Sequence, residues 1–348
     1  MSLVDTFLEL ISIESETGKE ENILDYIDQF LIKNNFDGEI IRNSGGIIAI
    51  PSESTQKIAL VGHVDTVPVV PNQQYEFDND DFIGGRGTVD MKGGIAIMMQ
   101  SLIENPSKII GIFYTAEESS YEDNGLNIIM PILLNDFDLD FAIILEPTNN
   151  EIQLGCLGAM NATLTLRGKA AHSARPWVGE NPVYKVNEII KLVQEYEITE
   201  LDIDGLQFKQ VMSITKISSG IANNVIPEEL KLNLNFRYSP EMSGEEASNF
   251  IKGLFSDHSD VDILNTSDGA MPNKGEVQIR DFIDTTGADV QPKQAWTDIA
   301  RFYQNDIPCL NFGPGDPLLA HATNEHISKR QLLESYELLS SYFKDKSE

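Results

Sequence analysis

The sequence is poor in cysteine and has no cysteine pair that could form a local motif. Only two of the 348 residues are cysteines, Cys156 and Cys309. Two cysteines are too few for the disulfide framework of a small secreted protein. Because neither has a second cysteine nearby, a cysteine-based structural zinc site is also excluded. We therefore expect a protein of the reducing cytoplasm.

Positive charge is scarce as well, and no hydrophobic run is long. The 25 Lys and Arg face 55 Asp and Glu, a formal net charge of -30. This balance argues against a nucleic-acid partner, which needs a basic surface, and against docking on an anionic membrane. The strongest apolar run, residues 109–114, is far shorter than the ~18–20 residues of a membrane span. The N-terminal MSLVDTFLEL lacks the basic region of a signal peptide, and we expect none.

In the first part of the chain, apolar runs of strand length alternate with helical patterns. Hydrophobic residues recur at helical spacing over residues 3–11, 23–31 and 91–102. Apolar runs of strand length lie at residues 46–50, 57–61, 109–115 and 141–145. Such alternation predicts an α/β domain with a mostly parallel sheet, whose functional sites lie at the carboxyl ends of the strands.

The pattern changes after about residue 160. Residues 161–167 and 230–236 alternate between apolar and polar side chains, which is typical of half-buried strands in an antiparallel sheet. The α/β pattern returns from about residue 267 and ends in a helix at about 329–343. We expect a discontinuous catalytic α/β domain, residues 1–160 and 267–348, with an inserted α+β module at residues 161–266.

Residues with metal-binding or acid–base capacity follow the predicted strands. They are His63 and Asp65 in GHVDT, Asp90 in GGRGTVDMKGG, Glu117 and Glu118 in TAEES, Glu146 in LEPT, and His321 in LLAHATNE. His63 and Asp65 lie two apart in an extended segment and so point to the same side, and carboxylates commonly orient zinc-binding histidines. Of two adjacent glutamates, one can bind metal while the other acts as general base.

Each of these residues, taken singly, has an ordinary explanation. Asp90 could cap a helix, and the glutamates and His321 could be solvated loop residues. The glycine-rich stretch lacks the G-x-x-x-x-G-K-[ST] pattern of a phosphate-binding loop, so we reject a nucleotide site there. Taken together, two histidines and several carboxylates form a mixed N/O ligand set. Such a set suits zinc better than calcium or magnesium, which prefer oxygen ligands.

The motifs GHVDTVP, GGRGTVDMKGG, TAEES, LEPT and HATNEH, in this order, resemble those of the dizinc aminoacylase and carboxypeptidase family. This family includes acetylornithine deacetylases, glutamate carboxypeptidases and succinyl-diaminopimelate desuccinylases, and the resemblance spans nearly the whole chain. The segments GKAAHSARPWVGENP, AWTDIARF and IPCLNFGPGDPLLAHATNEH are most similar to a compact branch of desuccinylases.

The resemblance implies two zinc ions, with cobalt able to substitute. Of the motif residues, it assigns His63 and Glu146 to one ion, Glu118 and His321 to the other, and Asp90 to a bridge between them.

Further roles follow from the same resemblance. Asp65 would orient His63, and Glu117 would be the general base. The inserted module would be a dimerisation or lid domain, whose His172 reaches the active site of a neighbouring subunit. Asn224 and Arg237 would hold the substrate, and Arg175 and Arg301 are further candidates for binding its carboxylates. HSARPW departs from the HVAYPH-like run of longer desuccinylases, so the contacts that flank His172 are expected to differ.

The implied activity is that of a homodimeric amide hydrolase acting on a small, acidic N-acyl amino acid. It would release succinate and LL-diaminopimelate from N-succinyl-LL-2,6-diaminopimelate, a step of lysine biosynthesis. Other activities of the family share this chemistry and differ in substrate, and they remain as alternatives. They are those of an acetylornithine deacetylase, a hydrolase that releases lysine from a carrier protein, and a dipeptidase or carboxypeptidase. A non-catalytic relative is disfavoured, because all seven motif residues, Glu117 included, are intact.

Overall fold

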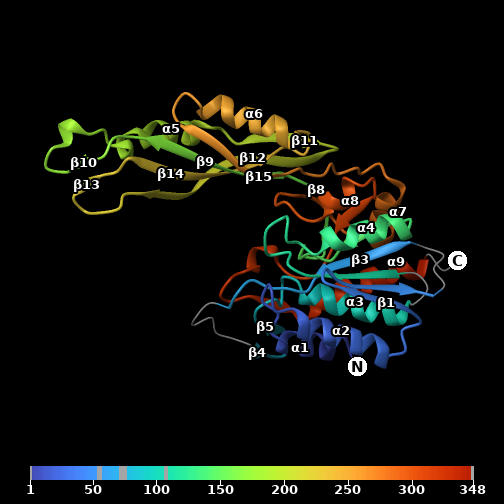
Figure 1. Ribbon diagram of the computed structural model, residues 1–348. Coiled ribbons are helices and arrows are strands. Elements are labelled where there is room, and N and C mark those ends of the chain that lie inside the picture. The colour runs from blue at the N-terminus through green and yellow to red at the C-terminus, as the bar shows by residue number, and fades with distance from the viewer. Residues whose placement is uncertain (1, 53–56, 70–76, 106–108, 346–348) are drawn as a thin grey trace. The chain divides into compact units, whose positions relative to one another are not determined.

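Two compact units make up the chain, and each is described here by itself. Figure 1 shows the computed structural model, which describes residues 2–52, 57–69, 77–105 and 109–345. Unit 1 comprises residues 1–154, 273–291 and 301–348, and unit 2 comprises residues 155–272 and 292–300. Among the described residues, no helix is both long and apolar enough to cross a membrane.

The centre of unit 1 is a mixed eight-stranded sheet. In spatial order its strands are β1 (Gly38–Asn43), β2 (Gly46–Pro51), β6 (Ile109–Tyr114), β3 (Ile58–His63), β7 (Phe141–Ile144), β17 (Cys309–Asn311), β8 (Ile152–Cys156) and β16 (Val290–Lys293). The four strands from β6 to β17 are parallel, whereas β1 and β2 pair antiparallel. Every residue of β3, β6 and β7 is buried. This explains their unbroken apolar sequences, since both faces of a parallel sheet are covered.

Helices cover both faces of this sheet. They are α1 (Leu3–Ser12), α2 (Glu21–Lys33), α3 (Lys92–Glu104), α4 (Leu126–Asp136), α7 (Val277–Thr286) and α9 (Lys329–Asp345), and the short α8 (Ile299–Tyr303) lies where the chain passes between the units. Figure 1 shows α1, α2 and α3 on one side of the sheet and α4 on the other. Helix α3 is buried almost all round and packs on β3, β6, α1, α2 and α9, as expected of a central helix with no polar face.

A small antiparallel sheet lies beside the glycine-rich stretch of unit 1. It consists of β4 (Phe77–Asp78), β5 (Phe82–Gly84) and β18 (His326–Ser328). In this sheet β5 pairs with β18, so that His326 lies opposite Gly84. The pairing brings the HATNEH motif next to the start of the glycine-rich loop, although the two are far apart in sequence.

Unit 2 is a five-stranded antiparallel sheet with helices on one face. In spatial order its strands are β11 (Thr199–Ile203), β12 (Leu206–Ser219), β14 (Glu229–Tyr238), β9 (Gly158–Arg167) and β15 (Asp260–Ser267). Helices α5 (Val186–Glu195) and α6 (Gly244–Phe255) contribute Ile189, Ala247, Ile251 and Phe255 to a core shared with alternate residues of β9 and β14. A separate two-stranded ladder joins β10 (Ala171–His172) to β13 (Val225–Ile226).

The predicted fold class, an α/β sheet together with an antiparallel α+β unit, is confirmed. Some details differ from the expectation. The pattern of residues 182–194 predicts a single helix, but residues 182–185 form a 3-10 turn ahead of α5, with Pro182 at its first position, where the missing N–H is tolerated. Residues 292–300 group with unit 2, where the indole Nε1 of Trp296 donates to the Asp268 carbonyl over 3.0 Å. A segment of this length is too short to show a hydrophobic periodicity, so its membership of unit 2 could not be predicted from the sequence.

Candidate active site

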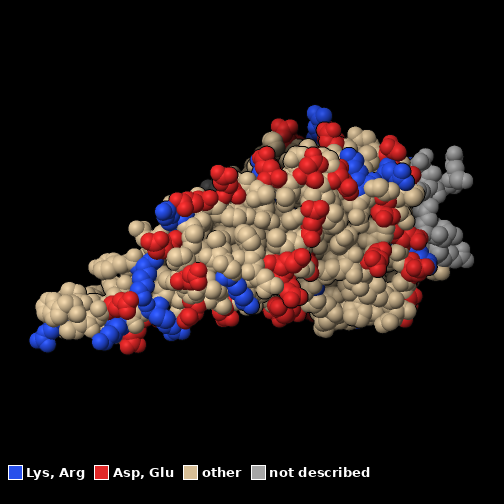
Figure 2. All heavy atoms as spheres, turned by 90° about the horizontal axis from the view of Figure 1, so that it is seen from above, with Lys and Arg blue, Asp and Glu red and all other residues tan. Residues whose placement is uncertain are grey.

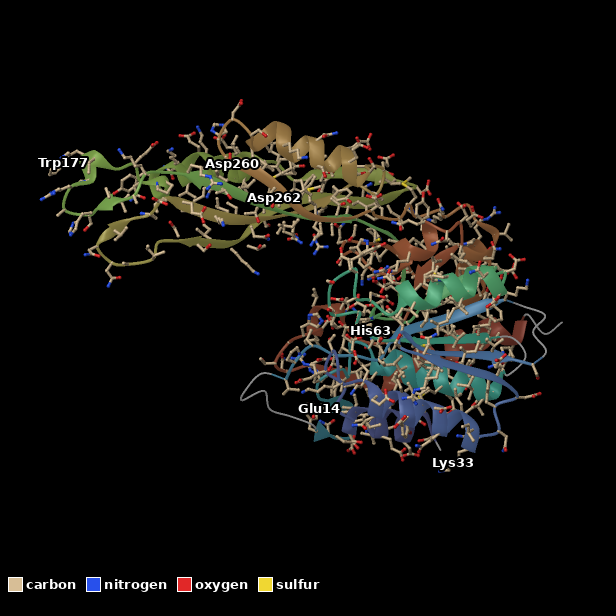
Figure 3. The ribbon with its side chains drawn as sticks, in the orientation of Figure 1. Glu14, Lys33, His63, Trp177, Asp260 and Asp262 are labelled. Atoms are coloured by element: carbon tan, nitrogen blue, oxygen red, sulfur yellow. The ribbon has the colours of Figure 1, made fainter. Side chains whose placement is uncertain are left out.

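The carboxyl ends of the parallel strands bring the predicted site residues of unit 1 together. His63 is the last residue of β3 and lies opposite Tyr114, the last residue of β6. Val61 lies opposite Ile144, the last residue of β7, which Glu146 follows by two positions. The strands therefore end nearly level, and the residues that follow them share one edge of the sheet. Figure 3 shows His63 at this end of β3.

Asp90 lies between the two histidines and offers one oxygen to each. Its Oδ1 is 3.1 Å from Nε2 of His63, and its Oδ2 is 3.2 Å from Nε2 of His321. Glu146 Oε1 lies 3.9 Å from the His63 nitrogen, and Glu118 Oε1 lies 2.7 Å from the His321 nitrogen. Asp90 therefore belongs to two groups of possible ligands, one with His63 and Glu146 and the other with Glu118 and His321. Within each group the ligand atoms lie within 4.8 Å of one another. This is the arrangement in which one carboxylate can bridge two cations.

The charges in this cluster favour bound cations. Hydrogen bonds to Asp90 and Glu118 raise the pKa of His321 to about 10. Burial alone would lower the pKa of His63, but its contacts with Asp65 and Asp90 and the nearby charge of Glu117 raise it well above its ordinary value. Conversely, the two histidines hold the pKa of Asp90 far below its usual range against the effect of its burial. The carboxylates outnumber the imidazoles, so the cluster attracts positive charge, which protons or metal ions can supply.

The donor set fits two zinc-like ions. Two imidazole nitrogens and several carboxylate oxygens converge without any cysteine sulfur, and such mixed N/O sets suit zinc, whereas calcium and magnesium prefer oxygen alone. Five carboxylates gathered at the end of a buried sheet would be costly without compensating charge. The described residues therefore include a cluster able to hold two metal ions. Glu117 lies close to it, because one of its oxygens is within 4.8 Å of ligand atoms of His63 and Glu118.

Asp65 acts on the site mainly through backbone groups. Its main-chain oxygen is 3.0 Å from Nδ1 of His63, closer than its carboxylate Oδ1 at 3.5 Å. The carboxylate itself accepts the N–H of Glu117 over 3.0 Å, the N–H of Glu118 over 3.1 Å and the hydroxyl of Thr17 over 2.8 Å. The histidine ring is thus oriented by a carbonyl, which is a common partner of metal-binding imidazoles, while the carboxylate fixes the two glutamates.

Two non-glycine residues of the site have left-handed backbone conformations. Ala116, directly before Glu117, has φ 56°, and His321 has φ 62°. This region costs most residues of order 1–3 kcal/mol and is found where surrounding contacts enforce it, often at functional sites. Ala116 directly precedes Glu117, and His321 itself belongs to the cluster, so both lie where the chain turns toward the cluster.

The remaining predicted residues, apart from Arg301, lie in unit 2. His172 forms the ladder with β13, and the N–H of Ser173 donates to the Asn224 carbonyl over 2.9 Å, so His172 and Asn224 are neighbours. The N–H of Arg175 donates to the His172 carbonyl over 2.8 Å. Arg237 lies instead on β14, where its Nε donates to Asn235 Oδ1 over 3.1 Å. The structure therefore groups three of the four near one end of unit 2.

The structure also shows residues that the sequence did not single out. Thr17 holds Asp65, and Glu325 accepts hydrogen bonds from the backbone around Asp90. Thr17 binds with its hydroxyl to a carboxylate and Glu325 accepts backbone N–H groups, and neither contact can be inferred from the sequence. Arg301 was expected to offer charge to a substrate, but this residue is buried and donates to Asn127 Oδ1 over 2.6 Å and to the Tyr121 carbonyl over 2.8 Å. Its guanidinium holds the loop after Glu118.

Comparisons with known proteins agree with this architecture. Residues 59–345 match the family described as peptidase family M20/M25/M40. A succinyl-diaminopimelate desuccinylase of Corynebacterium glutamicum is 34% identical over 349 residues, which cover 97% of this chain and 94% of that protein. A succinyl-diaminopimelate desuccinylase of Rickettsia bellii is 26% identical over 373 residues, covering 96% and 94% of the two chains.

A solved structure shares the fold at low sequence identity. The M20 family metallo-carboxypeptidase of Sulfolobus solfataricus superposes with a TM-score of 0.77 at 16% identity, over 99% of each chain. At this identity the likeness establishes the arrangement of the chain and leaves the substrate open.

Proposed function

The chain belongs to peptidase family M20/M25/M40 and is a hydrolase of that family, and we propose that it is a succinyl-diaminopimelate desuccinylase. The single observation that carries a metal-dependent mechanism is Asp90, whose two oxygens face His63 and His321 at 3.1 and 3.2 Å. The desuccinylase relatives, similar over nearly the whole chain, support the choice of substrate.

The metal ligands that we propose follow the two groups around Asp90. His63 and Glu146 would hold one ion, Glu118 and His321 the other, and Asp90 would bridge them. Two zinc ions bound there, or cobalt in their place, would supply a water of lowered pKa and a Lewis acid for the acyl oxygen.

The side chains of the protein would then carry out the proton transfers. Glu117 takes the proton of the attacking water and passes it to the leaving amine, so that amide and water become carboxylate and amine. Asp65 supports this role because it fixes the backbone N–H of Glu117. His172 of a partner subunit would donate a hydrogen bond to the oxyanion that forms as the amide carbon becomes tetrahedral.

We further propose a homodimer in which unit 2 supplies the contact surface. Exposed apolar side chains gather near the end that carries His172: Trp177 is 77% exposed, Tyr184 82% and Ile221 93%. Figure 3 shows Trp177 at the tip of unit 2. Large apolar groups of this kind mark sites of protein contact. Asn224, Arg237 and Arg175 would bind the carboxylates of the substrate. A cytoplasmic setting suits two free, buried cysteines.

A substrate panel tests the proposal. Metal-stripped protein should be inactive and should recover on adding zinc or cobalt, with N-succinyl-diaminopimelate hydrolysed faster than N-acetylornithine or a dipeptide. His321→Ala should remove one of two bound ions and most of the activity. Preference for N-acetylornithine or for a dipeptide would assign the chain to another activity of the family. Full activity of metal-free protein would exclude the metal mechanism altogether.

A further inference from the structure

A buried ion pair, Arg86 with Glu325, contacts the backbone of two of the proposed metal ligands, Asp90 and His321. Glu325 is only 3% exposed, and its Oε2 accepts a hydrogen bond from Nη1 of Arg86 over 2.7 Å. Neither residue belongs to the groups of possible metal ligands among the described residues, and neither has a part in the proposed chemistry. Because a buried ion pair often contributes little net stability, its presence here needs another explanation.

The small sheet places Glu325 against the glycine-rich loop. The end of β5 lies beside the start of the antiparallel β18, with His326 opposite Gly84. One residue further along, the N–H of Gly85 donates to the main-chain oxygen of Glu325 over 3.0 Å. Glu325 therefore stands at the start of the loop that leads to Asp90.

The two oxygens of the Glu325 carboxylate have different partners. Its Oε1 accepts the N–H of Val89 over 3.0 Å and the N–H of Asp90 over 3.2 Å, whereas its Oε2 faces Arg86. The carboxylate thus fixes the backbone of Asp90 itself. Once that backbone is fixed, only the two side-chain torsions of Asp90 remain to place its oxygens.

The same pair also reaches the segment that carries His321. The N–H of Glu325 donates to the Ala322 carbonyl over 3.3 Å, closing a turn directly after His321. Nη2 of Arg86 makes a longer contact, 3.5 Å, with the main-chain oxygen of His321. One ion pair therefore touches both segments that supply Asp90 and His321.

We infer that Glu325, supported by Arg86, is a positioning residue that sets the spacing of Asp90 and His321 and thereby the affinity for the metal ion they share. This inference rests on the proposed metal centre. Partners of metal ligands commonly act in this way, and their loss typically costs ~10–100-fold in metal affinity or activity. A residue that only stabilised the fold would leave the metal affinity of the folded protein unchanged.

The experiment compares Glu325→Ala and Glu325→Gln with a matched control, Glu20→Gln. Glu20 is also buried in unit 1, and its Oε1 has no hydrogen-bond partner among the described residues. Metal-stripped proteins are titrated with zinc against a chromophoric chelator, which yields the two dissociation constants. The visible absorption spectrum of the cobalt-loaded proteins reports the ligand geometry independently of catalysis.

Glu325→Ala should weaken the binding of one ion by roughly 10–100-fold and alter the cobalt spectrum. Glu325→Gln should have a smaller effect, because its amide oxygen still accepts from Val89 and Asp90 although the charge facing Arg86 is lost. Glu20→Gln should behave as wild type. Wild-type constants and spectra in folded Glu325→Ala would overturn the inference; if that variant fails to fold, the same result in Glu325→Gln overturns it. A wild-type chain that binds no metal would instead refute the proposed function.

Discussion

The carboxylate of Asp65 links three segments of the site through single hydrogen bonds. It accepts from the backbone of Glu117 and Glu118 and from the hydroxyl of Thr17. The two glutamates are thereby held side by side, and one oxygen of each lies within 4.8 Å of the other and of a His63 ring nitrogen. Glu118 reaches His321 over 2.7 Å, and this leaves Glu117 for a separate role.

The division of labour between these glutamates can be tested by two isosteric changes. Glu117→Gln should retain both metal ions but lose at least ~10²–10⁴-fold in kcat, the usual contribution of a general base. Glu118→Gln should weaken metal binding, since a neutral amide replaces a charged ligand. Elemental analysis together with kcat checks both. Metal loss in Glu117→Gln and retention in Glu118→Gln would reverse the roles.

The sequence predicts the residues of the cluster and Asp65, but it does not reveal Thr17 and Glu325, which also help to position them. His63, Asp90, Glu117, Glu118, Glu146 and His321 follow strand ends and carry recognisable chemistry, and the structure brings them together. Glu325 and Thr17 escaped notice because their partners are backbone N–H groups or one carboxylate, and such contacts depend on tertiary structure. Arg301 is an error of the opposite kind. Its charge suggested a contact with substrate, but the residue is buried and makes structural hydrogen bonds instead.

At the scale of elements, the loop between β6 and α4 carries both glutamates, and Arg301 of α8 holds it. Arg301, in α8, donates to the Asn127 side chain and the Tyr121 carbonyl. Its guanidinium also lies 3.8 Å from the centre of the Tyr121 ring. This cation–π contact adds to the two hydrogen bonds, so the loop has a buried anchor a few residues beyond Glu118.

Removing this anchor should affect stability and activity together. Arg301→Met would leave a carbonyl and an amide oxygen without their charged donor, and we expect a loss of roughly 2–4 kcal/mol in the free energy of unfolding. The catalytic rate should fall as well, because the loop carrying Glu117 loses its support. Denaturant unfolding and kcat measure the two effects. Arg280→Met, at an exposed arginine of α7, is the matched control and should change neither. Wild-type stability of Arg301→Met would contradict the anchor.

The elements that the sequence predicted well are those with unbroken patterns. The buried strands β3, β6 and β7 and the helices α1 to α3 follow directly from apolar runs and helical spacing. Helix α4 is hidden by Pro131 inside it, since proline normally argues against a helix interior. In β12 the register shifts between Ile214 and Lys216, and such a bulge interrupts the alternation from which a strand is predicted.

At the scale of the whole molecule, negative charge is in excess, and on the face that Figure 2 shows it is spread rather than gathered. The net charge is -30, and Figure 2 shows Asp and Glu side chains spread over the face in view, with Lys and Arg between them. A substrate with several carboxylates needs local positive charge. We propose that Arg237 of unit 2 supplies part of this charge. Burial lowers the pKa of its guanidinium, so this group is partly desolvated. Partly desolvated arginines form strong pairs with carboxylates.

The last prediction concerns His172, which we expect to complete the active site of a partner subunit. It is exposed, lies on the short β10–β13 ladder beside Asn224, and its Nδ1 accepts the N–H of Ala174 over 3.1 Å. With Nδ1 occupied as an acceptor, a neutral ring carries its proton on Nε2 and can donate outward. The exposed Trp177, Tyr184 and Ile221 supply apolar surface for a two-fold contact nearby.

Subunit complementation decides whether His172 acts across that contact. Homodimers of His172→Ala and of Glu117→Ala should each be nearly inactive. In an equal mixture after exchange, about half of the dimers would be mixed, and each would hold one complete site, so activity should recover to roughly a quarter of wild type. Differently tagged chains, recovered together, prove that exchange has occurred. A mixture of two Glu117→Ala preparations is the control and should stay inactive. The His172→Ala chain of a mixed dimer keeps Glu117, so its site can be completed only by the His172 of the partner subunit. If proven mixed dimers showed no recovery, His172 would have to serve its own chain or have no part in the reaction.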